Sequence, residues 1–105
     1  MRFDGFDWDA GNLAKCQKHG VSVGEIERAL AHDPLVAPDL VHSIEERRWI
    51  AIGRSEGSRA VFVAFAMRER AGLTLIRPVS ARYMHFKESK RHEQSAEDRS
   101  GDDQR

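Results

Sequence analysis

Arginine and lysine side chains offer the clearest chemistry in this 105-residue sequence. The segment Leu73–Arg91 begins as an apolar run and ends as a basic one. Arg82 stands at the end of the predicted strand, and the predicted helix after it carries Lys87, Lys90 and Arg91. A guanidinium group presents a planar fork of donors that matches a phosphate bidentately. The pattern indicates a phosphate site, although an ordinary last strand followed by a solvated helix would also produce it.

Charge is distributed unevenly, although the formal net charge of the chain is zero. Residues 1–46 contain nine acidic and four basic side chains, a net −5, and residues 47–94 contain four acidic and eleven basic ones, a net +7. Residues 95–105 have four acidic and two basic side chains, a net −2. This asymmetry indicates an electrostatic partner for the central segment, either nucleic acid or an acidic protein. Overall neutrality disfavours a protein that coats DNA non-specifically.

Length and composition predict one small domain in a reducing compartment. A chain of 105 residues can bury one modest core. The sequence has no apolar run near the ~20 residues of a membrane span, and Met1–Gly5 lacks a signal-peptide core. Its one cysteine, Cys16, can form no internal disulfide, and a packed thiol is expected. We expect a cytoplasmic protein whose single domain covers residues 1–94, with residues 95–105 as a disordered tail.

The first predicted helix follows a short aromatic strand or extended arm at residues 3–8. Asp9 is its predicted N-cap, and the glycine after His19 is its predicted end. Residues three and four apart share one side of a helix. The spacing therefore predicts a polar side and an apolar side: Asn12, Lys15, Lys18 and His19 against Leu13 and Cys16.

A second helix and three consecutive strands follow in the predicted fold. Ser22 and Glu25 form a capping-box pattern for a helix that ends near His32. Residues 35–40 contain a proline and predict an edge strand or an irregular connection. The three strands, joined by short polar turns, and a last helix are predicted at residues 47–53, 60–67, 73–81 and 85–94. The expected fold class is α+β, an antiparallel β-meander with two helices before it and one after it.

Two arginines end strands that are expected to run parallel to each other. Arg54 ends the first strand of the meander and Arg82 ends the third. Because both strands are antiparallel to the central one, both ends point the same way, and the two side chains converge if the register allows it. Pro78 removes one ladder donor from the third strand, so we expect a bulge beside it.

Several short motifs, taken in order along residues 3–94, resemble the BrnT toxin family. The most specific are Trp8-Asp9, Lys18–Ser22 and Ser80–Arg82. Further matches are Phe6-Asp7, Asn12, Asp33–Leu35, Glu46-Arg47, Ile50–Gly53 and Lys87-Glu88. Two positions depart from the family pattern: Pro78 stands where an aliphatic residue is usual, and His92 where an aromatic residue is common.

This resemblance implies the toxin half of a bacterial type II toxin–antitoxin pair, with a RelE-like ribonuclease fold. Such a toxin is a metal-independent endoribonuclease that cuts RNA and inhibits translation. It is neutralised by a BrnA-like antitoxin with a ribbon-helix-helix domain, and operator DNA is bound only through that antitoxin. The alternative is a non-catalytic binding module or co-repressor that acts only in complex with its antitoxin.

Cleavage by the RNA 2′-hydroxyl needs a base for that hydroxyl, an acid for the leaving oxygen and positive charge for the transition state. His19 could serve as acid or base because histidine titrates near pH ~6.5, although it could equally serve only to end its helix. Arg54 and Arg82 would supply the charge. Glu46 could be a base or could orient Arg47.

The candidate site therefore has two groups of residues. The catalytic candidates are Lys18, His19, Glu46, Arg54 and Arg82. The RNA-binding candidates are Lys15, Lys87, Lys90 and Arg91. Helical lysines are often only solvated charges, and the last three could equally contact an acidic face of the antitoxin. Because the histidines stand at no metal-ligand spacing, we expect neither a metal nor another cofactor.

Overall fold

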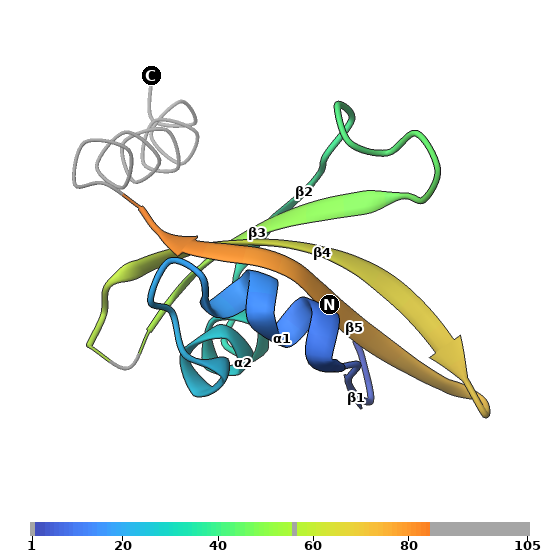
Figure 1. Ribbon diagram of the computed structural model, residues 1–105, viewed down its shortest axis with the longest axis horizontal. Coiled ribbons are helices and arrows are strands. Elements are labelled where there is room, and N and C mark those ends of the chain that lie inside the picture. Colours follow the sequence, from blue (N-terminus) through green and yellow to red (C-terminus); the bar gives the residue numbers. More distant parts are fainter. Residues whose placement is uncertain (1, 56, 85–105) are drawn as a thin grey trace, which may run out of the picture.

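The computed structural model describes residues 2–55 and 57–84, in which two helices cover one face of a five-stranded sheet (Figure 1). The elements in order are β1 Gly5–Phe6, α1 Ala10–Gln17, α2 Val23–Ala31, β2 Leu35–Pro38, β3 Arg48–Arg54, β4 Ala60–Arg70 and β5 Leu73–Tyr83. The strand order across the sheet is β1-β5-β4-β3-β2. None of the described helices is long and apolar enough to cross a membrane.

The predicted antiparallel meander is confirmed for β3, β4 and β5, and β2 adds to it as an antiparallel edge strand. The meander is only part of the sheet, which is mixed because β1 pairs with β5 in parallel. Gly5 lies opposite Leu75 and Phe6 opposite Ile76. The predicted last helix at residues 85–94 and the predicted tail lie outside the described residues.

Both helices begin at the predicted N-caps, Asp9 and Ser22, and both caps are reciprocal, although a reciprocal pair was predicted only for Ser22 and Glu25. The Asp9 carboxylate accepts from the backbone N–H of Asn12 at 3.1 Å, and the Asn12 side-chain oxygen accepts from the backbone N–H of Asp9 at 2.7 Å. Ser22 and Glu25 form the corresponding pair at the start of α2. Gly20 follows α1 with φ of +86°, a conformation that favours glycine. Local side-chain chemistry thus sets where each helix starts.

The predicted division of α1 into a polar and an apolar side is wrong at Asn12. This residue is buried together with Cys16, one turn further along, while the lysines and the histidine predicted to share its side are exposed. The Asn12 amide group donates to the backbone carbonyls of Asp7 and Pro78, both at 2.9 Å. These bonds satisfy a buried polar side chain. They also tie the start of α1 to the last strand.

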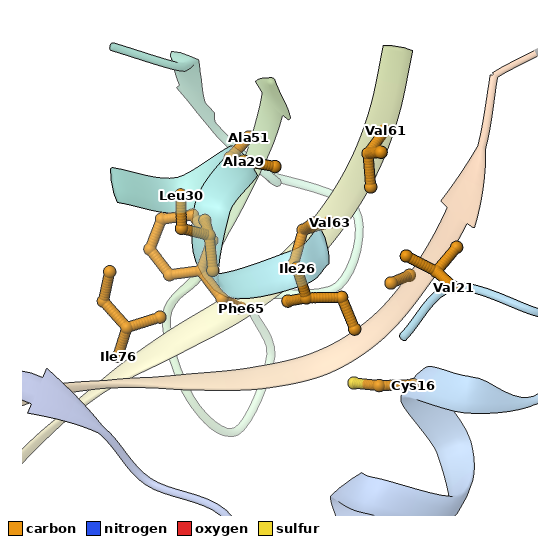
Figure 2. Packing of buried hydrophobic residues seen from close by; sticks show 11 residues of the cluster. Cys16, Val21, Ile26, Ala29, Leu30, Ala51, Val61, Val63, Phe65 and Ile76 are labelled. Atoms are coloured by element: carbon orange, nitrogen blue, oxygen red, sulfur yellow. The ribbon is translucent and has the colours of Figure 1, made fainter. Parts of the chain in front are cut away.

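The hydrophobic core lies between the helices and the sheet, with α2 packed over β3 and β4 (Figure 2). Cys16 contributes from α1, Ala51 from β3 and Ile76 from β5. Burial of a large apolar side chain stabilises a fold by roughly 1.5–3 kcal/mol. The central contacts of this core come from Ile26, Ala29, Leu30, Val61, Val63 and Phe65.

Gly53 lets the backbone of α2 approach β3 closely. A Cβ atom at this position would lie 2.3 Å from the carbonyl oxygen of Ala29, far inside contact distance. A residue without a side chain is therefore required where helix and strand meet.

A bulge interrupts β5 beside Pro78, as predicted. Ala64 pairs with Ser80 and Phe65 pairs with Pro78, so Val79 has no residue opposite it in β4. Proline has no backbone N–H to donate to the ladder, which explains why the irregularity falls here.

Candidate functional site

The sheet face that points away from the helices carries several arginines. Along β4, Val61, Val63 and Phe65 enter the core, so the residues between them point to the opposite side. The pairing of β4 with its neighbours extends this alternation across the sheet. We call this surface the open face. Its central residues are Arg48, Ile50, Ile52, Arg54, Phe62, Ala64, Ala66, Arg68, Ser80 and Arg82.

Arg82 stacks on an aromatic ring of the open face. Its guanidinium carbon lies 4.7 Å from the centroid of the Phe62 ring, and Phe62 is its partner in the β4–β5 pairing. Ile52 lies opposite Phe62 on the other side, in β3. A cation–π contact of this kind orients the guanidinium plane. Arg82 therefore places positive charge at a defined position on the sheet.

Arg54 lies on the same face and at the same end of the sheet as Arg82, with β4 between them. Its Nη1 donates to the backbone carbonyl of Ser58 at 2.9 Å. Because neighbouring strands are about 4.8 Å apart, the backbones of β3 and β5 are separated by roughly 10 Å. Two arginine side chains can reach one phosphodiester across that separation. The predicted common direction of the two strand ends is confirmed.

Glu46 reaches the open face from the connection between β2 and β3. Its carboxylate forms an ion pair with Arg68, and both side chains are partly exposed. An exposed pair of this kind contributes at most about 1 kcal/mol to stability. The guanidinium carbon of Arg47, which Glu46 could orient if it is not a base, lies 5.3 Å from the ring centroid of Trp49. The ion pair places a carboxylate beside Arg68, towards the end of the open face opposite Arg54 and Arg82.

The connection at residues 39–47 rises from the sheet on the side away from the helices (Figure 1). It encloses two hollows with the open face, of about 280 Å³ and about 340 Å³. The first is lined by Asp39, Val41, His42, Arg48, Ile50, Phe62, Ala64 and Ser80. The second is lined by Val41, His42, Ile44, Glu45, Glu46 and Arg48. Because they share three residues, we treat the two hollows as one feature and call it the sheet groove.

Asp39 and His42 form a pair in the sheet groove that no prediction from the sequence included. The Nδ1 atom of His42 lies 2.9 Å from Oδ2 of Asp39, whose side chain is only 9% exposed. The available signal was the three-residue spacing, since an aspartate in a turn commonly bonds to groups two or three residues on. That spacing is common in turns, so by itself it does not indicate a functional site.

The structure divides the predicted site between two layers. The helix layer carries Lys15, Lys18 and His19, all exposed, and α1 packs on the covered side of β5. The open face carries Glu46, Arg54 and Arg82. The three remaining candidates lie outside the described residues: Lys87, Lys90 and Arg91. Within the described residues, Arg54 and Arg82 lie at one end of the open face, and Glu46 pairs with Arg68 towards the other end. The helical candidates lie in the opposite layer.

Tyr83 connects the end of β5 to the first turn of α2. Its hydroxyl donates to the Glu25 carboxylate, and the guanidinium carbon of Arg59 lies 3.9 Å from the centroid of its ring. The bond lowers the pKa of Glu25 and raises the pKa of Tyr83, because it stabilises the carboxylate and the protonated phenol together. This cluster strengthens the contact between the sheet and α2.

Cys16 has the environment of a structural thiol. Burial raises the pKa of its thiol to about 11, so the reactive thiolate is disfavoured at neutral pH. Within residues 2–55 and 57–84, no three His, Cys, Asp or Glu side chains are grouped so that they could hold a metal ion.

Comparison with known proteins places the chain in a family. A family model described as the ribonuclease toxin BrnT of a type II toxin–antitoxin system matches residues 8–88. The matched range contains both helices, strands β2 to β5 and the whole sheet groove. A search among curated proteins found no match. The chain belongs to the BrnT family of ribonuclease toxins from type II toxin–antitoxin systems.

Proposed function

We propose that this chain is a RelE-like endoribonuclease that acts in the cytoplasm and binds RNA on the open face of its sheet. The observation that carries the proposal is the position of Arg54 and Arg82 at one end of that face, where Arg82 stacks on Phe62, a residue that lines the sheet groove. Neither described helix packs on this face. The family description supplies the class of reaction.

Cleavage by the neighbouring 2′-hydroxyl is the mechanism that fits these residues. Negative charge develops on the phosphoryl oxygens as that hydroxyl attacks, and Arg54 and Arg82 are placed to stabilise it. Removal of one such donor typically costs about 10²–10³-fold in rate. The reaction requires no metal ion, and we expect cleavage to continue in the presence of a chelator. Lys15, Lys18 and His19 are proposed to contact flanking RNA.

The neutralising partner is proposed to be a BrnA-like antitoxin with a ribbon-helix-helix domain, through which alone operator DNA is bound. Large apolar side chains are exposed on the connection that borders the sheet groove: Leu40 is 80%, Val41 75% and Ile44 90% exposed. Grouped exposed apolar side chains commonly mark a protein interface. An antitoxin bound there would cover the groove. Ile44→Asp should then abolish neutralisation while toxicity remains.

The proposal is tested by inducing the wild type and Arg82→Ala in cells, with growth and new RNA ends measured together. We expect arrest and cleavage in the wild type and the loss of both in Arg82→Ala. Arg59→Ala is the matched control, because Arg59 also stacks on an aromatic ring but on Tyr83, away from the groove. This variant should retain both effects.

Two results would contradict the proposal. Arrest without new RNA ends would assign the toxicity to another target. A folded wild type that causes neither arrest nor cleavage would favour the alternative, a binding module or co-repressor that acts only with its antitoxin. Purified protein assayed with and without ribosomes then shows which form of RNA is the substrate.

A further inference from the structure

We infer that His42, oriented by Asp39, is the general base that takes the proton from the 2′-hydroxyl of RNA bound in the sheet groove. The inference rests on the proposed ribonuclease activity and adds to it the proton acceptor that the open-face arginines cannot provide. An arginine stays protonated in proteins, so it can stabilise charge but cannot accept a proton.

The contact with Asp39 determines which nitrogen of His42 is available. A carboxylate can only accept hydrogen bonds, so the Nδ1 atom of His42, 2.9 Å from Oδ2, must be the donor. In a neutral imidazole the other nitrogen, Nε2, then carries the lone pair. This is the arrangement in which an aspartate holds a histidine in the tautomer that acts as a base. The carboxylate also stabilises the imidazolium that forms when the proton is taken.

Asp39 is itself held firmly against the sheet. Its backbone N–H donates to the Arg48 carbonyl at 2.9 Å, and its carboxylate also accepts from the backbone N–H of His42 at 3.3 Å. The Ser43 hydroxyl donates to the Asp39 carbonyl and accepts from the backbone N–H of Arg48 at 3.0 Å. These bonds fasten the turn that carries the pair to the first residue of β3. The imidazole is thus supported by a rigid strand although it lies in a connection.

The position of His42 suits contact with a substrate. Its side chain is 64% exposed, while that of Asp39 is 9% exposed, so the base is accessible and its partner is buried. His42 lines both hollows of the sheet groove, and Arg48 lines both with it. Phe62, on which Arg82 stacks, lines the first hollow. The groove therefore offers a proton acceptor and fixed positive charge to one phosphodiester.

The reaction is an attack of the 2′ oxygen on the neighbouring phosphorus atom. The 2′ oxygen forms a bond to phosphorus while its proton passes to Nε2 of His42. The bond between phosphorus and the 5′ oxygen of the next nucleotide breaks, and that oxygen takes a proton from water. The hydroxide that remains receives the proton held by His42. The products are one RNA end with a 2′,3′-cyclic phosphate and one with a free 5′-hydroxyl.

The experiment compares His42→Gln and Asp39→Asn with a control histidine variant in cleavage of RNA by the purified protein, with ribosomes if they are required. Loss of a general base typically costs about 10²–10⁴-fold. We expect a loss of that size in kcat for His42→Gln, with KM changed much less. The control is His32→Gln, because the Nδ1 atom of His32 also contacts one group, the Arg28 carbonyl at 2.8 Å, but lies outside the groove.

The pH dependence of kcat/KM separates a chemical role from a structural one. The charged groups around His42 in the groove are Asp39, Arg48, Glu45 and Glu46. A base must be unprotonated, so the wild-type rate falls on the acid side of the profile, and this fall should be absent in His42→Gln. Asp39→Asn can keep the turn but presents an amide donor to Nδ1, which favours the wrong tautomer. It should lower kcat while its thermal midpoint stays close to that of the wild type.

Three outcomes would overturn the inference. His42→Gln could cleave at the wild-type rate and keep the decrease in kcat/KM at acid pH, while Arg82→Ala is inactive. That result would show that His42 is not the base and would leave the ribonuclease function in place. Product ends that carry a 5′-phosphate would exclude the 2′-hydroxyl step and with it the base. A wild type that cleaves no RNA would overturn both the function and the inference.

Discussion

The guanidinium carbon of Arg82 lies 4.7 Å from the centroid of the Phe62 ring, which faces it across the β4–β5 pairing. A second arginine–aromatic contact involves the next residue of β5, where Arg59 lies 3.9 Å from the ring centroid of Tyr83. Neighbouring residues of a strand point to opposite faces, so the two contacts lie on opposite sides of the sheet. Only the contact of Arg82 lies beside the sheet groove.

Replacing Phe62 with leucine tests how much the ring contributes to the position of Arg82. Phe62→Leu keeps an apolar side chain but removes the cation–π contact, which is worth about 0.5–1 kcal/mol at an exposed site. We expect a decrease of about 2–5-fold in kcat/KM for RNA, much smaller than the effect of Arg82→Ala. Arg82→Lys, which keeps the charge without the planar fork, should fall between them. Equal losses in Phe62→Leu and Arg82→Ala would contradict this order and give the ring a direct contact with RNA.

Gly53→Ala should destabilise the fold because its methyl group would collide with the backbone of α2. The added Cβ would lie 2.3 Å from the Ala29 carbonyl oxygen, so helix or strand must move, at a typical cost of about 1–3 kcal/mol. Gly24→Ala in α2 is the control, since a Cβ there meets nothing within 4 Å and alanine is the better helix former. Urea unfolding at neutral pH measures both variants. A Gly53→Ala protein as stable as Gly24→Ala would show that α2 does not approach β3 so closely.

The bond between Tyr83 and Glu25 should make stability depend on pH at both extremes. The pKa of Glu25 is lowered from its ordinary 4.5, so its contribution is present above that pH and is lost as the pH falls through the folded-state value. The pKa of Tyr83 is raised from its ordinary 10.0, so its contribution is present below that pH and is lost as the pH rises through the folded-state value.

Tyr83→Phe removes the contribution of the phenol and the largest cause of the lowered Glu25 pKa, while Ser22 and Arg59 still lower it. Its free energy of unfolding should therefore vary less with pH below 4.5 and above 10.0 than that of the parent. Burial also raises the pKa of Cys16, so the comparison is made in a Cys16→Ala background. Urea unfolding at a series of pH values gives the two slopes. Identical slopes with and without the phenol would show that the bond does not form in solution.

The sequence predicts those parts of the fold that depend on neighbouring residues. The two capping boxes, at Asp9 and Ser22, and the glycine after α1 are local signals, and they place both helices correctly. The continuous apolar run at residues 60–67 places β4, because a central strand is buried on both faces. The apolar run that begins at Leu73 places β5. The parallel pairing of β1 with β5 joins Asp4 to Thr74, 70 residues away, and a two-residue strand carries no signal for so distant a partner.

In the candidate site, too, the sequence predicts what depends on strand order and local spacing, but not what depends on contacts between distant segments. The order of the strands predicts that Arg54 and Arg82 lie at the same end of the sheet, and the structure confirms this. The spacing on α1 put Asn12 with the lysines, but spacing cannot say which side of a helix is buried, and the polar side chain of Asn12 lies in the core. The pair of Asp39 and His42 depends on how an irregular connection lies over the sheet. No periodic pattern encodes that, so the pair appears only in three dimensions.

The bulge at Val79 determines which side chains of β5 face the core and which lie on the open face. Ile76 and Ala81 are both buried, although the interval between them is odd and a regular strand would send them to opposite faces. The additional residue cancels that difference and leaves Arg82 on the open face. A deletion or insertion of one residue in this interval would turn either Arg82 inward or Ile76 outward. This part of the chain is therefore constrained in its length as strictly as in its residue types.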